Sequence, residues 1–228
     1  MFLGHVGVAL GAKRLAPQTS AGVLVAAAML IDLIWPLLLL LGIERLEIVP
    51  GLTAANPLRF THYPITHSLL LVLGWAALAA AGYLALRRAP RAALVIAALV
   101  VSHWLLDFIT HIPDLPLWPG AGPRVGLGLW NSLAATVLVE GAIYGAGVAL
   151  YIGATTPQDR TGVLAFWGFV LLLAVIYAST LLGPPPPDTR TVAISALALW
   201  LLPPWAHWFD RHRARDTVAG AARNVPGP

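Results

Sequence analysis

The stretch RAALVIAALVVSHWLLDFITH, residues 91–111, decides the fold class of this chain. It has the length of about 20 mostly apolar residues that a helix needs to cross a bilayer. His103, Asp107 and His111 recur at intervals of four and therefore lie along one face of the predicted helix. A charge near the bilayer centre costs roughly 2.5–3.5 kcal/mol on insertion scales, so such groups turn inward towards partners. We therefore expect a spanning helix whose polar face belongs to a site.

The rest of the chain has the same membrane-spanning character. Of its 228 residues, 58% are hydrophobic and only 11% are charged, which is far from the composition of a soluble domain. Six runs are long enough to span a bilayer, roughly 21–43, 64–86, 91–112, 127–152, 162–182 and 190–209. The first fifteen residues, MFLGHVGVALGAKRL, are apolar but carry their basic pair behind them, unlike a secretory signal, and predict a retained half-helix. The expected fold is all-α, a polytopic transmembrane helical bundle of about six spans plus this half-helix.

Basic residues predict the orientation of the bundle. Ten of the fourteen lie in the N-terminal segment, in the loops 87–91 and 153–161, and in the tail, whereas four lie on the other side. The richer side should be cytoplasmic, so the loops 44–63, 113–126 and 183–189 should face outward. Because these basic residues lie at the ends of spans, nucleic-acid binding is excluded as a function. We expect one transmembrane domain, residues 1–209, with its site within 1–140, and a basic cytoplasmic tail, 210–228.

Ionisable residues inside the expected spans suggest a metal site. The chain contains no cysteine, so a metal would be held by nitrogen and oxygen. Imidazoles with carboxylates suit a divalent metal, zinc first, with manganese, iron or nickel as alternatives. The candidate ligands are His5, Asp32, His62, His67, His103 and Asp107, and the candidate catalytic residues are Asp107 and Glu140. Supporting hydrogen bonds or substrate contacts are expected from Thr66, Ser68, Ser102, Thr110, His111, Asn131 and Ser132.

Five short sequence blocks, which include most of these candidate residues, together resemble a family of bacterial inner-membrane proteins. This family is described as membrane-bound metal-dependent hydrolases, some of them LexA-regulated. The matching blocks are GH at 4–5, LIDLIWP with Asp32, HYPITHS at 62–68, SHWLLDFIT at 102–110 and LPLWP at 115–119. The resemblance covers residues 1 to about 132 and implies hydrolysis. Two positions depart from the family pattern: Ile34 replaces a second acidic residue and Tyr63 replaces an arginine, which weakens a two-metal site and phosphate recognition.

The leading hypothesis is a membrane-embedded hydrolase that cleaves a lipid-like ester or phosphoester with a metal-activated water. Its substrate would be a membrane lipid or a lipid-like molecule, and the oligomeric state stays open. The alternative is a proton- or metal-coupled transporter that uses the same His/Asp cluster. Two further readings are a haem protein with His67 and His103 as axial ligands, and a non-catalytic protein in which the cluster only orders the helices.

Overall fold

The computed structural model describes residues 1–215. Its α-helices are α1 (Leu3–Gly11), α2 (Ala21–Ala28), α3 (Leu30–Leu40), α4 (Pro64–His67), α5 (Leu69–Arg87), α6 (Pro90–Thr110), α7 (Leu133–Ile152), α8 (Arg160–Leu182), α9 (Thr189–Ala196) and α10 (Leu202–Arg211). Short 3-10 turns occupy Ala12–Arg14, Leu129–Asn131 and Leu197–Leu201. Three two-stranded antiparallel pairs join β1 (Arg45–Ile48) to β2 (Leu58–His62), β3 (Leu115–Pro116) to β4 (Arg124–Val125), and β5 (Thr155–Pro157) to β6 (Arg213–Arg215).

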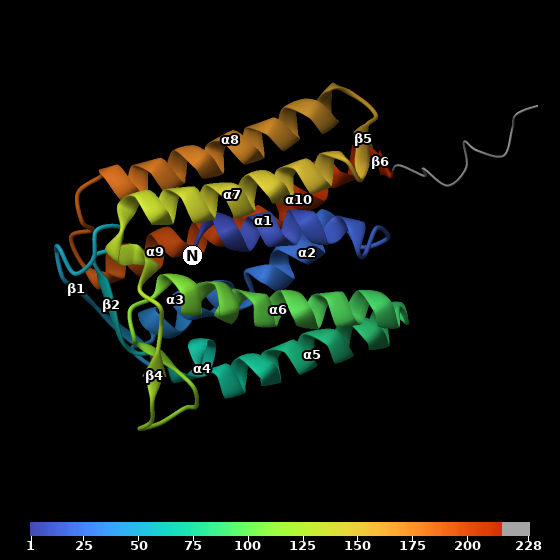
Figure 1. Ribbon diagram of the computed structural model, residues 1–228. Coiled ribbons are helices and arrows are strands. Elements are labelled where there is room, and N and C mark those ends of the chain that lie inside the picture. Colours follow the sequence, from blue (N-terminus) through green and yellow to red (C-terminus); the bar gives the residue numbers. More distant parts are fainter. Residues whose placement is uncertain (216–228) are drawn as a thin grey trace, which may run out of the picture.

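The expected helical membrane bundle is confirmed. Within the described residues, five helical segments are long and apolar enough to cross a membrane, and the bent pair α2 and α3 makes a sixth. The long helices run side by side, with α5 and α6 on one side, α7 and α8 on the other, and α1, α2 and α10 between them (Figure 1). Helix α1 starts inside the bundle and runs to the basic end, as the predicted half-helix requires (Figure 1).

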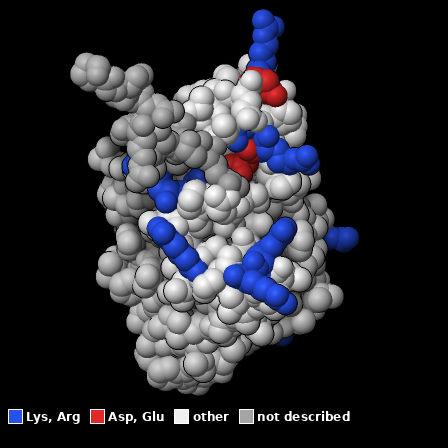
Figure 2. All heavy atoms as spheres, turned by 90° about the vertical axis from the view of Figure 1, so that its right-hand side faces the viewer, with Lys and Arg blue, Asp and Glu red and all other residues white. Residues whose placement is uncertain are grey.

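The two ends of the bundle differ in composition. The hairpin end contains residues 41–62, 112–132 and 183–188, and it bears the pairs β1–β2 and β3–β4. The basic end contains residues 12–20, 88–89, 153–159 and 212–215, together with β5–β6. Lysine and arginine side chains are spread over the basic end (Figure 2). The segments therefore divide between the two ends as the counting of basic residues assumed.

Helix α1 packs tightly against α7 because glycines let the two backbones touch. A methyl group built on Gly147 would lie 2.0 Å from the carbonyl oxygen of Gly7. One built on Gly7 would lie 2.7 Å from the carbonyl oxygen of Ile143. The two positions hold the N-terminal half-helix inside the bundle, where His5 is almost fully buried.

The first, second and fourth predicted spans are each interrupted or begin late, and the causes are local. The first predicted span, 21–43, bends by 53° at Met29, between α2 and α3. The second, 64–86, is broken at Ser68, whose extended backbone separates α4 from α5. The fourth, 127–152, begins as a helix only at Leu133, because Ser132 caps it by accepting a hydrogen bond from the backbone N–H of Ala135.

Residues 210–215, the first part of the predicted tail, belong to the packed structure. Asp210, in the last turn of α10, accepts hydrogen bonds from the Lys13 ammonium group (2.7 Å) and the Tyr151 hydroxyl (2.7 Å). Arg213 is also buried and donates to the side-chain and backbone oxygens of Thr155. The remaining tail residues, 216–228, lie outside the described part of the chain.

Candidate functional site

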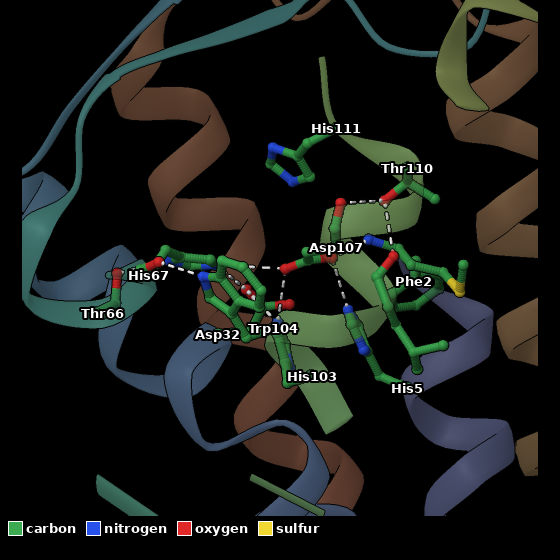
Figure 3. A network of polar contacts seen from close by, with 12 residues as sticks. Phe2, His5, Asp32, Thr66, His67, His103, Trp104, Asp107, Thr110 and His111 are labelled. Atoms are coloured by element: carbon green, nitrogen blue, oxygen red, sulfur yellow. Dashed lines mark hydrogen bonds and ion pairs between the residues drawn. The ribbon is translucent and has the colours of Figure 1, made fainter. Parts of the chain in front are cut away.

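Five of the six predicted metal ligands meet inside the bundle (Figure 3). They come from four helices that are far apart in the sequence: His5 from α1, Asp32 from α3, His67 from α4, and both His103 and Asp107 from α6. All of them are buried except Asp32, whose side chain is 23% exposed. Asp107 lies three residues before α6 ends, about 4.5 Å along the helix axis. The cluster is therefore near the hairpin end and not at the centre of the bundle.

The central contacts join two imidazoles to two carboxylates. His67 Nε2 lies 3.5 Å from Asp32 Oδ1 and 3.7 Å from Asp107 Oδ2. His103 Nε2 lies 3.5 Å from Asp32 Oδ1 and 3.2 Å from Asp107 Oδ2. Each of the two imidazole nitrogens thus faces both carboxylates.

The tautomer of His103 follows from its second nitrogen. His103 Nδ1 lies 2.7 Å from the backbone carbonyl oxygen of Ala28 and must donate its hydrogen to it, because a carbonyl oxygen only accepts. This carbonyl is available because α2 ends at Ala28, and the last carbonyls of a helix lack intrahelical partners. In the neutral ring, His103 Nε2 therefore carries a lone pair. That atom is buried and has no hydrogen-bond partner among the described residues.

A buried carboxylate that sequence reasoning missed fixes the other imidazole. Glu44 accepts hydrogen bonds from the backbone N–H groups of Ile65 and Thr66 (2.9 Å each), and from the Thr66 hydroxyl (2.7 Å). The Thr66 oxygen lies 2.7 Å from His67 Nδ1. Since the hydroxyl hydrogen goes to Glu44, His67 Nδ1 donates to Thr66, and His67 Nε2 is left with a lone pair.

The break at Ser68 is supported by two indole groups. Trp104 donates its Nε1 hydrogen to the carbonyl oxygen of His67 (2.9 Å), and Trp75 donates to that of Ile65 (2.9 Å). Both carbonyls would otherwise lack partners, because α4 has only one turn. Trp104 thus helps to hold His67 in place, a role that its position within an apolar run did not indicate.

His5 approaches the cluster from the opposite side of Asp107. Its Nε2 lies 3.1 Å from Asp107 Oδ1, and its ring stacks on that of His103 with centroids 3.6 Å apart. The amino group of Met1 contacts the same carboxylate oxygen. His5, His103 and Asp107 form a second group of atoms close enough to share an ion.

Glu140, predicted as a catalytic residue, has a structural role in this arrangement. It is buried and accepts hydrogen bonds from the backbone N–H groups of Phe2 (2.8 Å) and Leu3 (2.9 Å). These are among the first N–H groups of α1, where a negative charge is favourable. The predicted role of Glu140 as a general base stays a prediction.

His111 belongs to a neighbouring polar group and not to the cluster. Its Nδ1 lies 2.9 Å from Asp114 Oδ1, which also accepts a hydrogen bond from the Tyr63 hydroxyl (3.0 Å). Burial, together with the Asp114 carboxylate, raises the pKa of Tyr63 well above its usual value, so the hydroxyl stays a donor. Asp114 was missed because it follows the span, in a Pro-rich loop.

Several predicted site residues lie elsewhere. His62 is exposed at the end of β2, where it pairs with Arg45, so its expected place among the ligands was wrong. Asn131 and Ser132 are exposed beyond the cluster, where Ser132 caps α7. The Ser68 hydroxyl donates to the backbone carbonyl of Pro64, and the Ser102 hydroxyl donates to that of Leu99. The Thr110 hydroxyl donates to the backbone carbonyls of Leu106 and Asp107. Of the predicted supporting residues, only Thr66 bonds an imidazole of the cluster through its side chain.

A cavity of about 790 Å³ leads from the cluster to the hairpin end. Asp32, His67 and Asp107 lie on its inner wall. Its side walls come from α8 and α9, including Ile176 and Val192, and from the loop between β1 and β2. This volume lies within the usual range for small-molecule sites. The predicted restriction of the site to residues 1–140 therefore applies to the polar cluster, whereas later helices supply the cavity walls.

Comparison with known proteins agrees with this membrane architecture. No curated protein and no solved structure matches the chain. A family model described as the YdjM inner membrane protein matches residues 1–182, which include every residue of the polar cluster and helix α8. The chain therefore belongs to the YdjM inner membrane protein family.

Proposed function

We propose that this protein is a membrane-embedded, metal-dependent hydrolase that cleaves a lipid-like ester or phosphoester. The observation that carries the proposal is that two imidazole nitrogens, His67 Nε2 and His103 Nε2, each lie 3.2–3.7 Å from both Asp32 Oδ1 and Asp107 Oδ2. Ligands about 2.0–2.2 Å from a tetrahedral zinc ion are separated by roughly 3.3–3.6 Å. The four His–Asp separations are of this size, and Asp32, His67 and His103 form one group of atoms close enough to share such an ion.

The electrostatics of the cluster favour a cation. In their neutral forms the two imidazoles would direct lone pairs at two carboxylates, and acceptors facing acceptors in a buried site are unfavourable. A divalent ion would turn both repulsions into ligand bonds. Because His103 has one free nitrogen, the two overlapping ligand groups compete for it. In a one-metal site, His5 would hold Asp107 by donating to its other carboxylate oxygen.

The cavity supports hydrolysis as the chemistry. A bound zinc, or manganese, iron or nickel in its place, lowers the pKa of a coordinated water towards neutrality and polarises a carbonyl or phosphoryl oxygen. Asp32 is the partly exposed member of the ligand set and lines the cavity. We place the reacting water beside Asp32, where it meets a substrate that enters through the cavity.

The position of the site supports a lipid-like substrate. The cluster lies about one helical turn below the hairpin end, and the outer surfaces of α8 that flank the cavity bear exposed apolar residues such as Val175 and Ile176. A molecule with acyl chains can therefore reach the site from the bilayer. By the distribution of basic residues, we place the basic end in the cytoplasm and the site towards the outer side of the inner membrane.

The transporter alternative has less support. Alternating access needs routes from the site to both ends of the bundle. The cavity that contains Asp32 and His67 reaches the hairpin end, whereas the second described cavity, at the basic end, contains none of the cluster residues. Haem ligation by His67 and His103 is also disfavoured, because carboxylate oxygens lie between the two nitrogens.

The test is metal content and lipid hydrolysis measured on the same tag-free preparation. We expect close to one zinc-type ion per chain by mass spectrometry, and cleavage of ester or phosphoester lipids in mixed micelles. Asp32→Asn and His103→Ala should lose both metal and cleavage, and His62→Ala, which changes the exposed histidine, should keep both. A folded wild type that takes up no added zinc, manganese, iron or nickel would refute the proposal.

A further inference from the structure

The outer part of the cavity differs chemically from the cluster at its inner end. Near the hairpin end, its wall contains Thr53 and Asn56 from the β1–β2 loop, Ser179 and Thr180 from α8, and the prolines 184–186. We call this set the rim. Among the described residues, the cavity wall contains no lysine and no arginine, and its acidic residues are Asp32, Asp107 and Glu140. The rim is therefore polar but uncharged.

The rim presents acceptors and has few donors to offer. The sequence GPPPP, residues 183–187, includes four prolines, which have carbonyl oxygens and no N–H groups. The hydroxyl hydrogens of Ser179 and Thr180 are used by carbonyl oxygens one turn earlier on α8, those of Val175 (2.8 Å) and Tyr177 (2.8 Å). Their oxygens keep lone pairs for a ligand.

The loop side of the rim has the same polarity. Thr53 donates its hydroxyl hydrogen to the carbonyl oxygen of Asn56 (2.8 Å), so its oxygen can only accept from a ligand. The side-chain oxygen of Asn56 is used by the backbone N–H of Leu58 (2.9 Å). The side-chain amide of Asn56 is the exception in this set, since its N–H groups remain able to donate.

We propose that the rim selects lipids whose head group donates hydrogen bonds and carries no net negative charge. An ammonium or hydroxyl head group would find acceptor oxygens on both α8 and the proline segment. An anionic head group would meet the same oxygens without a lysine or arginine to balance its charge. This inference rests on the proposed function in taking a lipid as the occupant, and it adds the class of head group.

The experiment compares three lipids with the same acyl chains. Phosphatidylethanolamine has an ammonium donor, phosphatidylcholine has a cation without an N–H, and phosphatidic acid is an anion. Native mass spectrometry of the as-purified full chain in detergent separates bound intact lipid from bound product by mass. We expect phosphatidylethanolamine to bind about tenfold more tightly than phosphatidylcholine, as a hydrogen bond to a charged group implies. Phosphatidic acid should bind most weakly.

A matched pair of variants tests the rim itself. Thr180→Lys adds a cation to the rim, whereas Leu182→Lys adds one to an exposed residue of α8 that does not line the cavity. Thr180→Lys should raise the affinity for phosphatidic acid severalfold, and Leu182→Lys should leave the order of the three lipids unchanged. Equal or tighter binding of phosphatidic acid by the wild type would overturn the inference.

The result separates this inference from the proposed function. Selective binding of phosphatidylethanolamine without any product would support the proposed head-group selectivity of the rim and refute the proposed lipid hydrolysis. Hydrolysis of all three lipids without any preference in binding would support the proposed hydrolysis and refute the proposed selectivity of the rim.

Discussion

His103 donates its Nδ1 hydrogen to the carbonyl oxygen of Ala28 across a distance of 2.7 Å, at the point where the first span bends by 53°. The bend makes the carbonyl available, and the same bend places Asp32 in the first turn of α3, where its negative charge suits the helix N-terminus. One interruption of a hydrophobic helix therefore orients an imidazole and positions a carboxylate. The irregular backbone is part of the construction of the site.

The hydrogen bonds that link Glu44 to Thr66 and Thr66 to His67 should control metal affinity. Thr66→Val removes the acceptor of the His67 Nδ1 hydrogen, and Glu44→Gln weakens the group that orients Thr66. Loss of such supporting bonds costs roughly 10–100-fold in metal affinity. We expect this loss in zinc competition titrations with a chromophoric chelator.

Thr110→Val is the matched control for Thr66→Val. The Thr110 hydroxyl is buried and bonds only backbone carbonyls of its own helix, at 3.3 Å. Its loss should change zinc affinity by less than about threefold, because hydrogen bonds of this kind contribute little. An equal effect of the two valine variants would show that Thr66 does not act through His67.

The contact between α1 and α7 should be sensitive to a single methyl group. Gly147→Ala puts a Cβ atom against the backbone of Gly7, and such overpacking costs about 1–3 kcal/mol. Gly145→Ala, on the same helix, meets nothing within 4 Å and removes the flexibility of a helical glycine. We expect a lower unfolding temperature for the first variant and an equal or higher one for the second, by differential scanning fluorimetry. Similar unfolding temperatures would contradict the tight contact.

A buried ion pair should hold the basic end together. Lys13 and Asp210 are 2.7 Å apart, and their side chains are 4% and 9% exposed. Lys13→Met leaves the Asp210 carboxylate without this partner, and breaking a buried pair costs about 3–5 kcal/mol. The exposed pair of Arg59 and Glu47, 3.8 Å apart, gives the comparison: Arg59→Met should cost no more than about 1 kcal/mol. Denaturant unfolding in detergent measures both, and equal losses would contradict the prediction.

Sequence reasoning found the residues of the buried polar cluster because intramembrane histidine and aspartate are costly and therefore informative. The intervals of four on α6 and the depth of His67 relative to Asp107 are consistent with the contacts in the structure. The role of Glu44 was not predictable in the same way, because it lies in a loop after α3, where a carboxylate needs no explanation. Its burial arises from the short helix α4, which appears only when the second span breaks at Ser68. The prediction that His62 is a ligand was wrong for the converse reason. Its motif matched, but His62 lies at the end of strand β2 and is exposed.

Metal removal should destabilise the whole bundle, because the proposed ligands come from α3, α4 and α6, and His5 of α1 contacts the Asp107 ligand. An ion that binds only the folded state stabilises it by about 2.7 kcal/mol at a hundredfold excess over its dissociation constant. Dialysis against a chelator should therefore lower the unfolding temperature of the wild type, and added zinc should restore it. Asp32→Asn removes a ligand oxygen and should be insensitive to both treatments, whereas His62→Ala should respond like the wild type. If neither chelator nor zinc changes the unfolding temperature of the wild type, the buried cluster only holds the helices together and does not bind a metal.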